Sequence, residues 1–412
     1  MIIPHSKHSP DYVIEINGEP LSAEMRGCVT SINYQNGLEG ADRVELGIAN
    51  PYLRWLDDPL LKIDNKFELS LGYSQTPLEK VFVGEITGVN ASFPNGGMPM
   101  LTVVAHDFMQ RLTVGTKDRD FGIRIPCFGI TPLPDPLVVS MVSLSNLLLP
   151  YPDPVGSVLS FLTLLLTYVS DPIETKKSIR KQESQSDFDF LTQVAKENGW
   201  EMYIDHTLDP QGYFLRFQFM LPSRTPDVTL QWGSSLMEFS PHLTTVGQVA
   251  GVAARIWIAA IQTELTIVLS WDYDRKGFNL EVVPGLGGLD VLAGKESKGV
   301  LKIDAIGPAT APRQILSELL PRLNNRLTGS GRCLADLRLR AGKVIELQNL
   351  GSEFSGLYRI TSANFSLDSG GFYTSFEVRK EIWFEDNLKE FAKQVLFPVK
   401  IPSIARVQNL GI

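Results

Sequence analysis

Cysteine and histidine are scarce in this sequence of 412 residues, which contains only three cysteines and five histidines. The cysteines, Cys28, Cys127 and Cys333, lie far apart and fit neither a CxxC motif nor the spacing of a zinc site. This excludes a disulfide framework and a zinc finger. We expect single, reduced thiols in a chain that folds in a cytoplasm.

The signature motifs of common enzymes are missing as well, because the sequence has no GxSxG, no HExxH and no P-loop. His106 and Asp107 are adjacent and could pair in a site, but their place at the end of an expected strand favours a structural role. Asp57 and Asp58 lie in loop-like sequence with no apolar pocket to raise a carboxyl pKa. The sequence therefore predicts a protein that is not an enzyme, with no catalytic, cofactor-binding or metal-binding residues.

Excess positive charge and long apolar runs are also lacking. The net charge is −8 and the isoelectric point is near 5.3, which argues against a nucleic-acid partner. Residues 1–10 lack the apolar stretch of a secretion signal. Residues 137–149 and 155–169 are strongly apolar, but each is shorter than the roughly 20 residues of a membrane-spanning helix. We expect the segment 137–169 to be buried or covered in an assembly, and we expect no membrane contact.

Short runs of alternating apolar and polar residues, separated by turn dipeptides such as Asn17-Gly18, dominate the first part of the chain. In residues 43–48 and 66–73, for example, every second residue is apolar. Several such runs in succession are typical of a small barrel, so we expect a first β-barrel at residues 10–121.

Residues 122–235 differ in character and predict an α/β insert. The clearest helix of the chain is expected at residues 186–198 within it. Ser186 can cap the first turn, Asp189 follows three residues later, and Gly199 can end the helix in a left-handed conformation. A second, strongly apolar helix is expected earlier in the insert.

The last third is again rich in expected strands. Residues 236–384 predict a second β-barrel that contains one helix at residues 312–327. Residues 385–396 have apolar residues at helical spacing, which predicts a C-terminal helix and tail at residues 385–412. The expected fold class is therefore mainly β: two β-barrels, an α/β insert between them, and a C-terminal helix with its tail.

Four segments, in order, carry a family resemblance: residues 81–86, 182–205, 230–249 and 339–374. The second is the strongest, with a polar start, an apolar helix, a glycine and a hydrophobic strand. Together they resemble the phage late control gene D family of tail hub proteins. That family is related to the N-terminal part of the type VI secretion valine-glycine repeat protein G. The chain departs from the family pattern at residues 123–154, which are longer and more apolar.

The resemblance implies a structural, trimeric hub of a contractile injection system or phage tail baseplate. Such a hub adapts a three-fold spike to a six-fold inner tube. The implied partners are two further copies of the chain, a separate spike protein, the inner tube protein and other baseplate components. The sequence ends without the oligonucleotide-fold domain and needle of the fused spike proteins, so a separate spike is expected. The hub would assemble in the cytoplasm and become part of a phage tail or injection-system particle.

Two other functions remain open. A tail-associated cell-wall hydrolase would need a defined carboxylate or cysteine–histidine site. A stand-alone, ligand-binding β-sandwich would be a monomer with a cleft. A stable homotrimer would favour the hub over both.

Overall fold

A computed structural model describes most of the chain. It covers residues 9–74, 76–125, 129–154, 157–158, 160–161, 164, 179–219, 224–244, 251–258, 263–272, 277–284, 300–304 and 311–382. The chain divides into two compact units. The first combines Met1–Thr244 with Asn325–Lys380, and the second combines Thr245–Asn324 with Glu381–Ile412. The expected C-terminal helix and tail at residues 385–412 lie outside the described residues.

The first barrel lies in unit 1 and is built from consecutive strands that follow the alternating sequence pattern. Its elements are β1 (Pro10–Ile16), β2 (Glu19–Pro20), α1 (Ala23–Gly27), β3 (Val29–Gly37), β4 (Arg43–Ala49), η1 (Pro51–Leu53), η2 (Pro59–Leu61), β5 (Lys66–Tyr73), β6 (Glu79–Ser92) and β7 (Met100–Asp107). The apolar faces predicted at residues 43–48 and 66–73 are confirmed. Val44, Leu46 and Ile48 are buried, as are Phe67 and Leu69.

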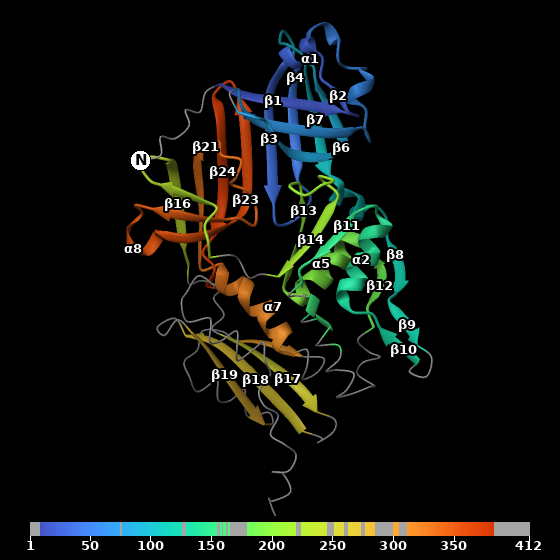
Figure 1. Ribbon diagram of the computed structural model, residues 1–412, viewed down its shortest axis with the longest axis vertical. Helices are drawn as coiled ribbons and strands as arrows, with labels where there is room; N and C mark the ends of the chain where they lie inside the picture. Colours follow the sequence, from blue (N-terminus) through green and yellow to red (C-terminus); the bar gives the residue numbers. More distant parts are fainter. Residues whose placement is uncertain are drawn as a thin grey trace, which may run out of the picture. The chain divides into compact units, whose positions relative to one another are not determined.

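The second barrel also lies in unit 1. Its elements are β15 (Val228–Gln231), β16 (Leu236–Leu243), β21 (Leu327–Leu334), β22 (Val344–Gln348), α8 (Gly351–Phe354), β23 (Gly356–Asp368) and β24 (Gly371–Arg379). Strand β23 pairs antiparallel with β3, so both barrels belong to one 13-stranded sheet. Figure 1 shows this contact, with the red strands β23 and β24 beside the blue strand β3.

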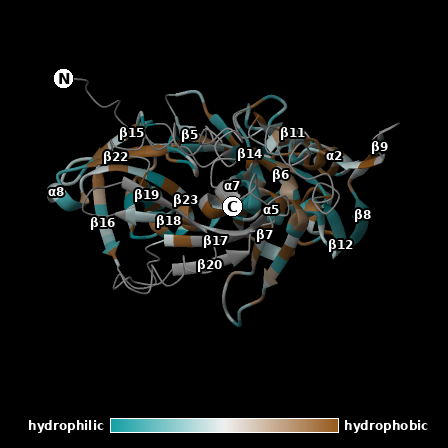
Figure 2. Cartoon of the chain, turned by 90° about the horizontal axis from the view of Figure 1, so that it is seen from below, coloured by the Kyte–Doolittle hydropathy of each residue, from teal (hydrophilic) through white to brown (hydrophobic). Residues whose placement is uncertain are grey.

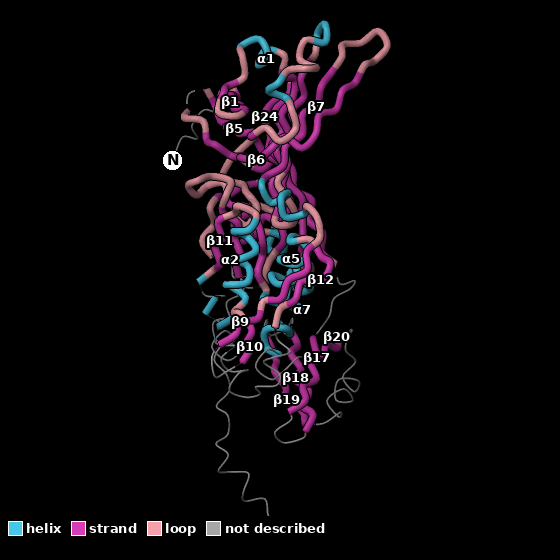
Figure 3. The backbone as a smooth tube through the Cα atoms, turned by 90° about the vertical axis from the view of Figure 1, so that its right-hand side faces the viewer, coloured by secondary structure: helices cyan, strands magenta, loops and turns pink. Residues whose placement is uncertain are grey.

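The α/β insert between the barrels contains η3 (Phe108–Thr113), β8 (Lys117–Asp120), β9 (Gly122–Ile125), β10 (Gly129–Pro132), α2 (Asp135–Ser145), β11 (Leu149–Pro152), β12 (Lys181–Gln185), α5 (Asp187–Asn198), β13 (Trp200–Asp205) and β14 (Phe214–Phe219). Helices α2 and α5 pack on one another (Figure 3). The insert begins at residue 108, earlier than the expected 122, because η3 packs into its hydrophobic core rather than that of the barrel.

The helix predicted at residues 186–198 is confirmed, together with both of its ends. Ser186 is the N-cap, and its side chain accepts a hydrogen bond from the Asp189 N–H at 3.0 Å. Gly199 ends the helix with φ +66°, a left-handed conformation that glycine adopts without a steric penalty. The buried face of the helix includes Phe190 and Leu191.

The apolar segment 137–169 is described mainly at helix α2, which is brown over much of its length in Figure 2. Val138, Val139 and Val142 are fully buried in the core of the insert. Leu137 and Met141 lie on the other side and are more than half exposed, at 52% and 55%. Among the described residues, no helix combines the length and the apolar character needed to cross a bilayer.

The structure divides the range 236–384 that was expected to form the second barrel. Its middle belongs to unit 2, where β17 (Gly251–Ile258), β18 (Thr263–Asp272), β19 (Gly277–Pro284) and β20 (Val300–Asp304) form a separate sheet in the order β19-β18-β17-β20. Helix α7 (Ala311–Asn324) follows. It confirms the helix expected at 312–327 but ends three residues earlier, because Leu327 begins β21. Alternation identifies strands, but it does not reveal which strands pair, so the sequence could not separate this sheet from the barrel.

Candidate functional site

His106 and Asp107, which the sequence singled out as a possible pair, have separate roles. The His106 Nδ1 atom lies 2.6 Å from the Thr87 hydroxyl, and burial followed by the charge of Arg43 lowers its pKa. Asp107 turns into the protein and accepts a hydrogen bond from the Met109 N–H at 3.0 Å. Asp58 caps the short helix η2 through the Leu60 N–H. None of these contacts forms a pair suited to catalysis.

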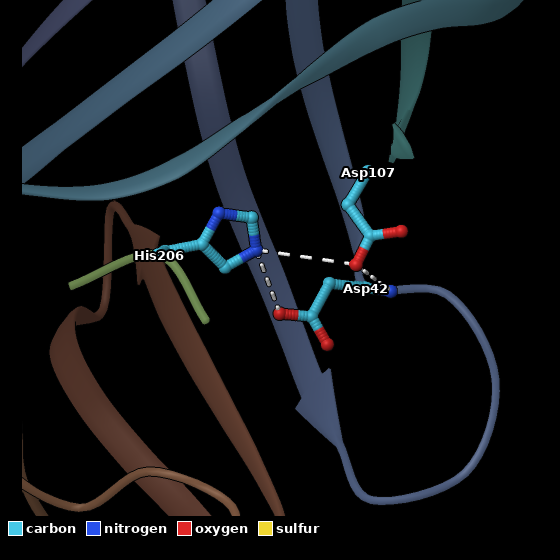
Figure 4. Close-up of side chains that lie close together, drawn as sticks. All are labelled: Asp42, Asp107 and His206. Atoms are coloured by element: carbon cyan, nitrogen blue, oxygen red, sulfur yellow. Dashed lines mark hydrogen bonds and ion pairs between the residues drawn. The ribbon is translucent and has the colours of Figure 1, made fainter. Parts of the chain in front are cut away.

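A buried polar cluster forms instead from three residues that are distant in sequence: Asp42, Asp107 and His206 (Figure 4). Asp42 precedes β4, Asp107 ends β7, and His206 follows β13 of the insert. The His206 Nε2 atom lies 3.3 Å from Asp42 Oδ2 and 3.9 Å from Asp107 Oδ2. The Asp42 N–H donates to Asp107 Oδ2 at 3.1 Å. The cluster thus fastens the insert to the end of the first barrel.

The electrostatics of the cluster distinguish its two carboxyl groups. Asp42 accepts hydrogen bonds from the Tyr34 hydroxyl, the Asn36 amide and the Gly37 N–H, all of which stabilise a carboxylate. Burial, followed by the nearby Asp42 charge, raises the pKa of Asp107 well above its usual value. Asp107 therefore holds a proton more readily than an exposed aspartate does.

The three side chains could approach a metal ion, since their ligand atoms lie within 4.8 Å of one another. The hydrogen bonding of the ring opposes this use. The Val83 N–H donates to His206 Nδ1 at 3.3 Å, which places the proton of a neutral ring on Nε2, the atom that faces the carboxyl groups. A metal-bound nitrogen carries no proton. The donor set therefore suits a hydrogen-bonded anchor better than a metal centre.

A second polar anchor connects the insert to the second barrel. Glu201 of β13 forms ion pairs with Arg359 of β23 and with Arg379 of β24, the latter at 2.8 Å. All three are largely buried, and the side chain of Arg359 is only 1% exposed. The insert therefore holds both barrels, each through a buried charged group.

Direct contacts between the barrels complete the junction. Along one edge, β23 pairs first with β22, from Gly356 to Arg359, and then with β3, from Ser362 to Leu367. The change of partner coincides with a bulge between Ile360 and Ser362. Beyond it, the ring of Phe365 stacks on that of Tyr34 at 5.6 Å.

Polar contacts reinforce this junction. The Asn36 side chain accepts the Ala341 N–H at 2.7 Å, and the Tyr73 hydroxyl donates to the Ala335 carbonyl at 2.9 Å. Sequence reasoning missed Asn36, Asp42, Glu201 and His206, because an isolated polar residue gives no signal of a distant partner.

Comparison with known proteins identifies solved structures with a similar fold. No protein-family model matches the sequence, and no curated protein matches it either. Among solved structures, the 43 kDa tail protein of prophage MuSo2 from Shewanella oneidensis matches with a TM-score of 0.61 and 13% identity, covering 92% of this chain and 100% of that chain. The tail protein from Neisseria meningitidis MC58 matches with a TM-score of 0.59 and 9% identity, covering 90% and 97%.

The chain has the fold of these tail proteins. The same fold extends to the E. coli c3393 protein, a component of the type VI secretion system, with a TM-score of 0.53 and 11% identity. That match covers 90% of this chain and 78% of that one. The resemblance read from the sequence is thus matched at the level of the tail-protein fold, and the mainly β fold class is confirmed.

Proposed function

We propose that this protein is the structural, trimeric hub of a phage tail baseplate or contractile injection system. The observation that carries the proposal is the repetition of one barrel architecture within a single sheet. The strand order β3-β4-β7-β6-β5 of the first barrel corresponds to β16-β21-β24-β23-β22 of the second, with antiparallel pairing throughout. The strands that follow differ, because β1 pairs antiparallel with β5 and β15 pairs parallel with β22. Three copies would therefore present six similar barrels, which is what an adaptor between a three-fold spike and a six-fold tube requires.

The tail-protein fold supports this proposal, and so does the way in which the chain uses its polar residues. Three of the buried carboxyl groups, Asp42, Asp107 and Glu201, bind other parts of unit 1 and are each less than 10% exposed. Groups committed to anchoring in this way fit a rigid scaffold, whereas a hydrolase needs a carboxylate that reaches its substrate.

The proposed partners are two further copies of the chain, a separate spike protein on one side, the inner tube protein on the other and the surrounding baseplate components. The hub would assemble in the cytoplasm and then belong to the particle. Neither a nucleic acid nor a membrane is needed for this role.

Light scattering coupled to size exclusion tests the oligomeric state. The purified full-length chain should have a mass three times that of one chain, which is 45.7 kDa. Electron microscopy of the trimer mixed with its inner tube protein should then show it seated on one end of the tube. A chain that remains monomeric at micromolar concentration would contradict the hub.

A further inference from the structure

The two barrels match not only in strand order but also in the positions of their irregularities. Strand β3 has a bulge between Val29 and Ser31 where it pairs with β4, and β16 has one between Leu236 and Glu238 where it pairs with β21. Strand β6 likewise has a bulge after Ile86. Bulges are specific local features, so their coincidence establishes residue-by-residue equivalence between the barrels.

The bulge in β6 lies between Ile86 and Gly88, and that in β23 lies between Ile360 and Ser362. In each case the residue that is left over is a threonine that follows an isoleucine. Gly88 of β6 is therefore equivalent to Ser362 of β23. By the same reasoning, Ser31 of β3 is equivalent to Glu238 of β16.

The equivalent edges differ in one respect. The edge of β23 is paired with β3, whereas the equivalent edges of β6 and β16 are not paired with one another. Beyond its bulge, β23 is covered by β3 from Ser362 to Leu367. In β6, pairing with β5 ends at Glu85, and the edge equivalent to the covered edge of β23 begins at Gly88. Within the ranges that the structure describes, no strand takes the place of β5 there. Strand β16 corresponds to β3 and pairs only with β21 among the described strands.

We propose that the open edge of β6 pairs with β16 of a neighbouring copy and so repeats between chains the β23–β3 junction found within one chain. This inference rests on the proposed trimer and specifies its interface. The equivalences fix the register. It follows from the internal pairs of Asn364 with Gln35 and of Ser366 with Asn33. Between copies, Asn90 lies opposite His242, and Ser92 lies opposite Ser240.

The side chains at these edges are consistent with such a contact. Two large apolar groups are exposed in the single chain, Phe93 at 59% and Leu243 at 41%. In the proposed register, Phe93 lies opposite Phe239 and Leu243 lies opposite Val89, so both would be covered. Burial of exposed apolar area of this kind is what favours association.

Proline adds a feature that the internal junction lacks. Pro241 takes the place of Tyr34 of β3. Four residues after Tyr34, the Leu38 N–H donates to the Thr361 carbonyl of β23 at 3.0 Å. Residues 34, 36 and 38 therefore direct their N–H groups toward β23, because these directions alternate along a strand. Proline has no N–H, so the proposed ladder has one donor fewer than the internal one. The missing donor weakens pairing of β16 with any neighbouring strand, so the proposed interface is weaker than the internal junction.

The geometry limits how far the pairing propagates. Each copy offers one β6 edge and one β16 edge, which are different surfaces, so the contact is head-to-tail. A head-to-tail contact forms a closed ring when the rotation between copies closes. A ring of three copies then alternates internal and intermolecular junctions around six barrels.

Paired cysteines test the register directly. The full-length Ser92→Cys/Ser240→Cys variant places two cysteines at a non-hydrogen-bonded pair, where Cα atoms lie about 4.5 Å apart and a disulfide can form. Mild oxidation should convert most of the purified protein into a covalent trimer on a non-reducing gel. The control is Asn90→Cys/Glu238→Cys, which is out of register by four residues, or about 14 Å. Each single-cysteine variant reports any contribution of Cys28, Cys127 and Cys333.

The outcomes separate this inference from the proposed function. A covalent trimer from the in-register variant, with little from the control, supports the β6–β16 interface. A chain that light scattering shows to be trimeric, but that gives no in-register cross-link or cross-links equally in the control, overturns the interface and leaves the hub intact. A chain that remains monomeric overturns both.

Discussion

Strand β23 and strand β6 occupy equivalent places in the two barrels, yet the same stretch of edge is buried in one and open in the other. Ala363 and Phe365 of β23 are 2% and 1% exposed, because β3 lies beside them. Their equivalents in β6 are Val89, which is partly exposed, and Ala91, which is exposed. The two stretches share isoleucine, threonine, asparagine and serine at equivalent positions, and they differ in their surroundings by the presence of β3 beside β23.

The largest expected effect on the free energy of unfolding is at Phe365, on the covered edge of β23. Replacing it by alanine should lower the free energy of unfolding by about 3–5 kcal/mol, the usual cost of truncating a buried phenylalanine. Phe93→Ala, on the open edge, should change the stability of the isolated chain by no more than about 0.5 kcal/mol. Urea denaturation followed by circular dichroism measures both. Equal losses would show that the two edges do not differ as described.

The next effect concerns the anchor of the second barrel. Glu201→Ala removes the carboxylate that pairs with Arg359 and Arg379 and should cost about 3 kcal/mol, because both guanidinium groups lose a buried ion-pair partner. Glu79→Ala is a matched control, since Glu79 pairs with Arg340 at 2.8 Å but is half exposed. It should cost less than about 1 kcal/mol. A loss at Glu201 no larger than at Glu79 would contradict the anchoring role.

The anchor of the first barrel should reveal itself through pH. The folded-state pKa of Asp107 is raised, so its protonated form stabilises the fold, and this contribution is lost as pH rises from the unfolded pKa toward the folded one. The stability of the natural protein relative to Asp107→Asn should therefore fall with rising pH, by at most about 1.4 kcal/mol per pH unit. Urea titrations between pH 4 and pH 8 measure this difference. A constant or rising difference would contradict the raised pKa of Asp107.

The smallest effect is local. Ser186→Ala removes the cap of helix α5 and should cost about 1 kcal/mol. Thr192→Ala, on the exposed face of the same helix, should be close to neutral. Thermal denaturation of the two variants makes the comparison. If both changes were neutral, the cap would contribute nothing to stability.

What could be predicted from the sequence follows the same division between local and distant contacts. Helix α5 was predicted with both ends because Ser186, Asp189 and Gly199 act within a few residues of the helix. The alternating strands were predicted for the same reason. The change of partner along β23, by contrast, depends on a strand more than 300 residues earlier in the chain.

The candidate site was less accessible still. Asp107 was singled out only through its neighbour His106. Its actual partners are distant in sequence, because Asp42 precedes β4 and His206 follows β13 of the insert. The interrupted second barrel was missed because the sequence indicates strands in unit 2 but does not indicate that they pair with one another in a separate sheet.

The junction between β16 and β21 has one further consequence. The chain leaves unit 1 after Thr244 and returns to it at Asn325. The Thr244 N–H donates to the carbonyl of the next residue, Arg326, at 3.0 Å. The two ends of an 80-residue excursion, Thr245–Asn324, therefore meet as the ends of an ordinary hairpin turn would. Lengthening such a loop costs little, about 0.6 kcal/mol for each doubling. Segments of different length can therefore replace residues 245–324 at this turn without a change in the register of the β16–β21 ladder.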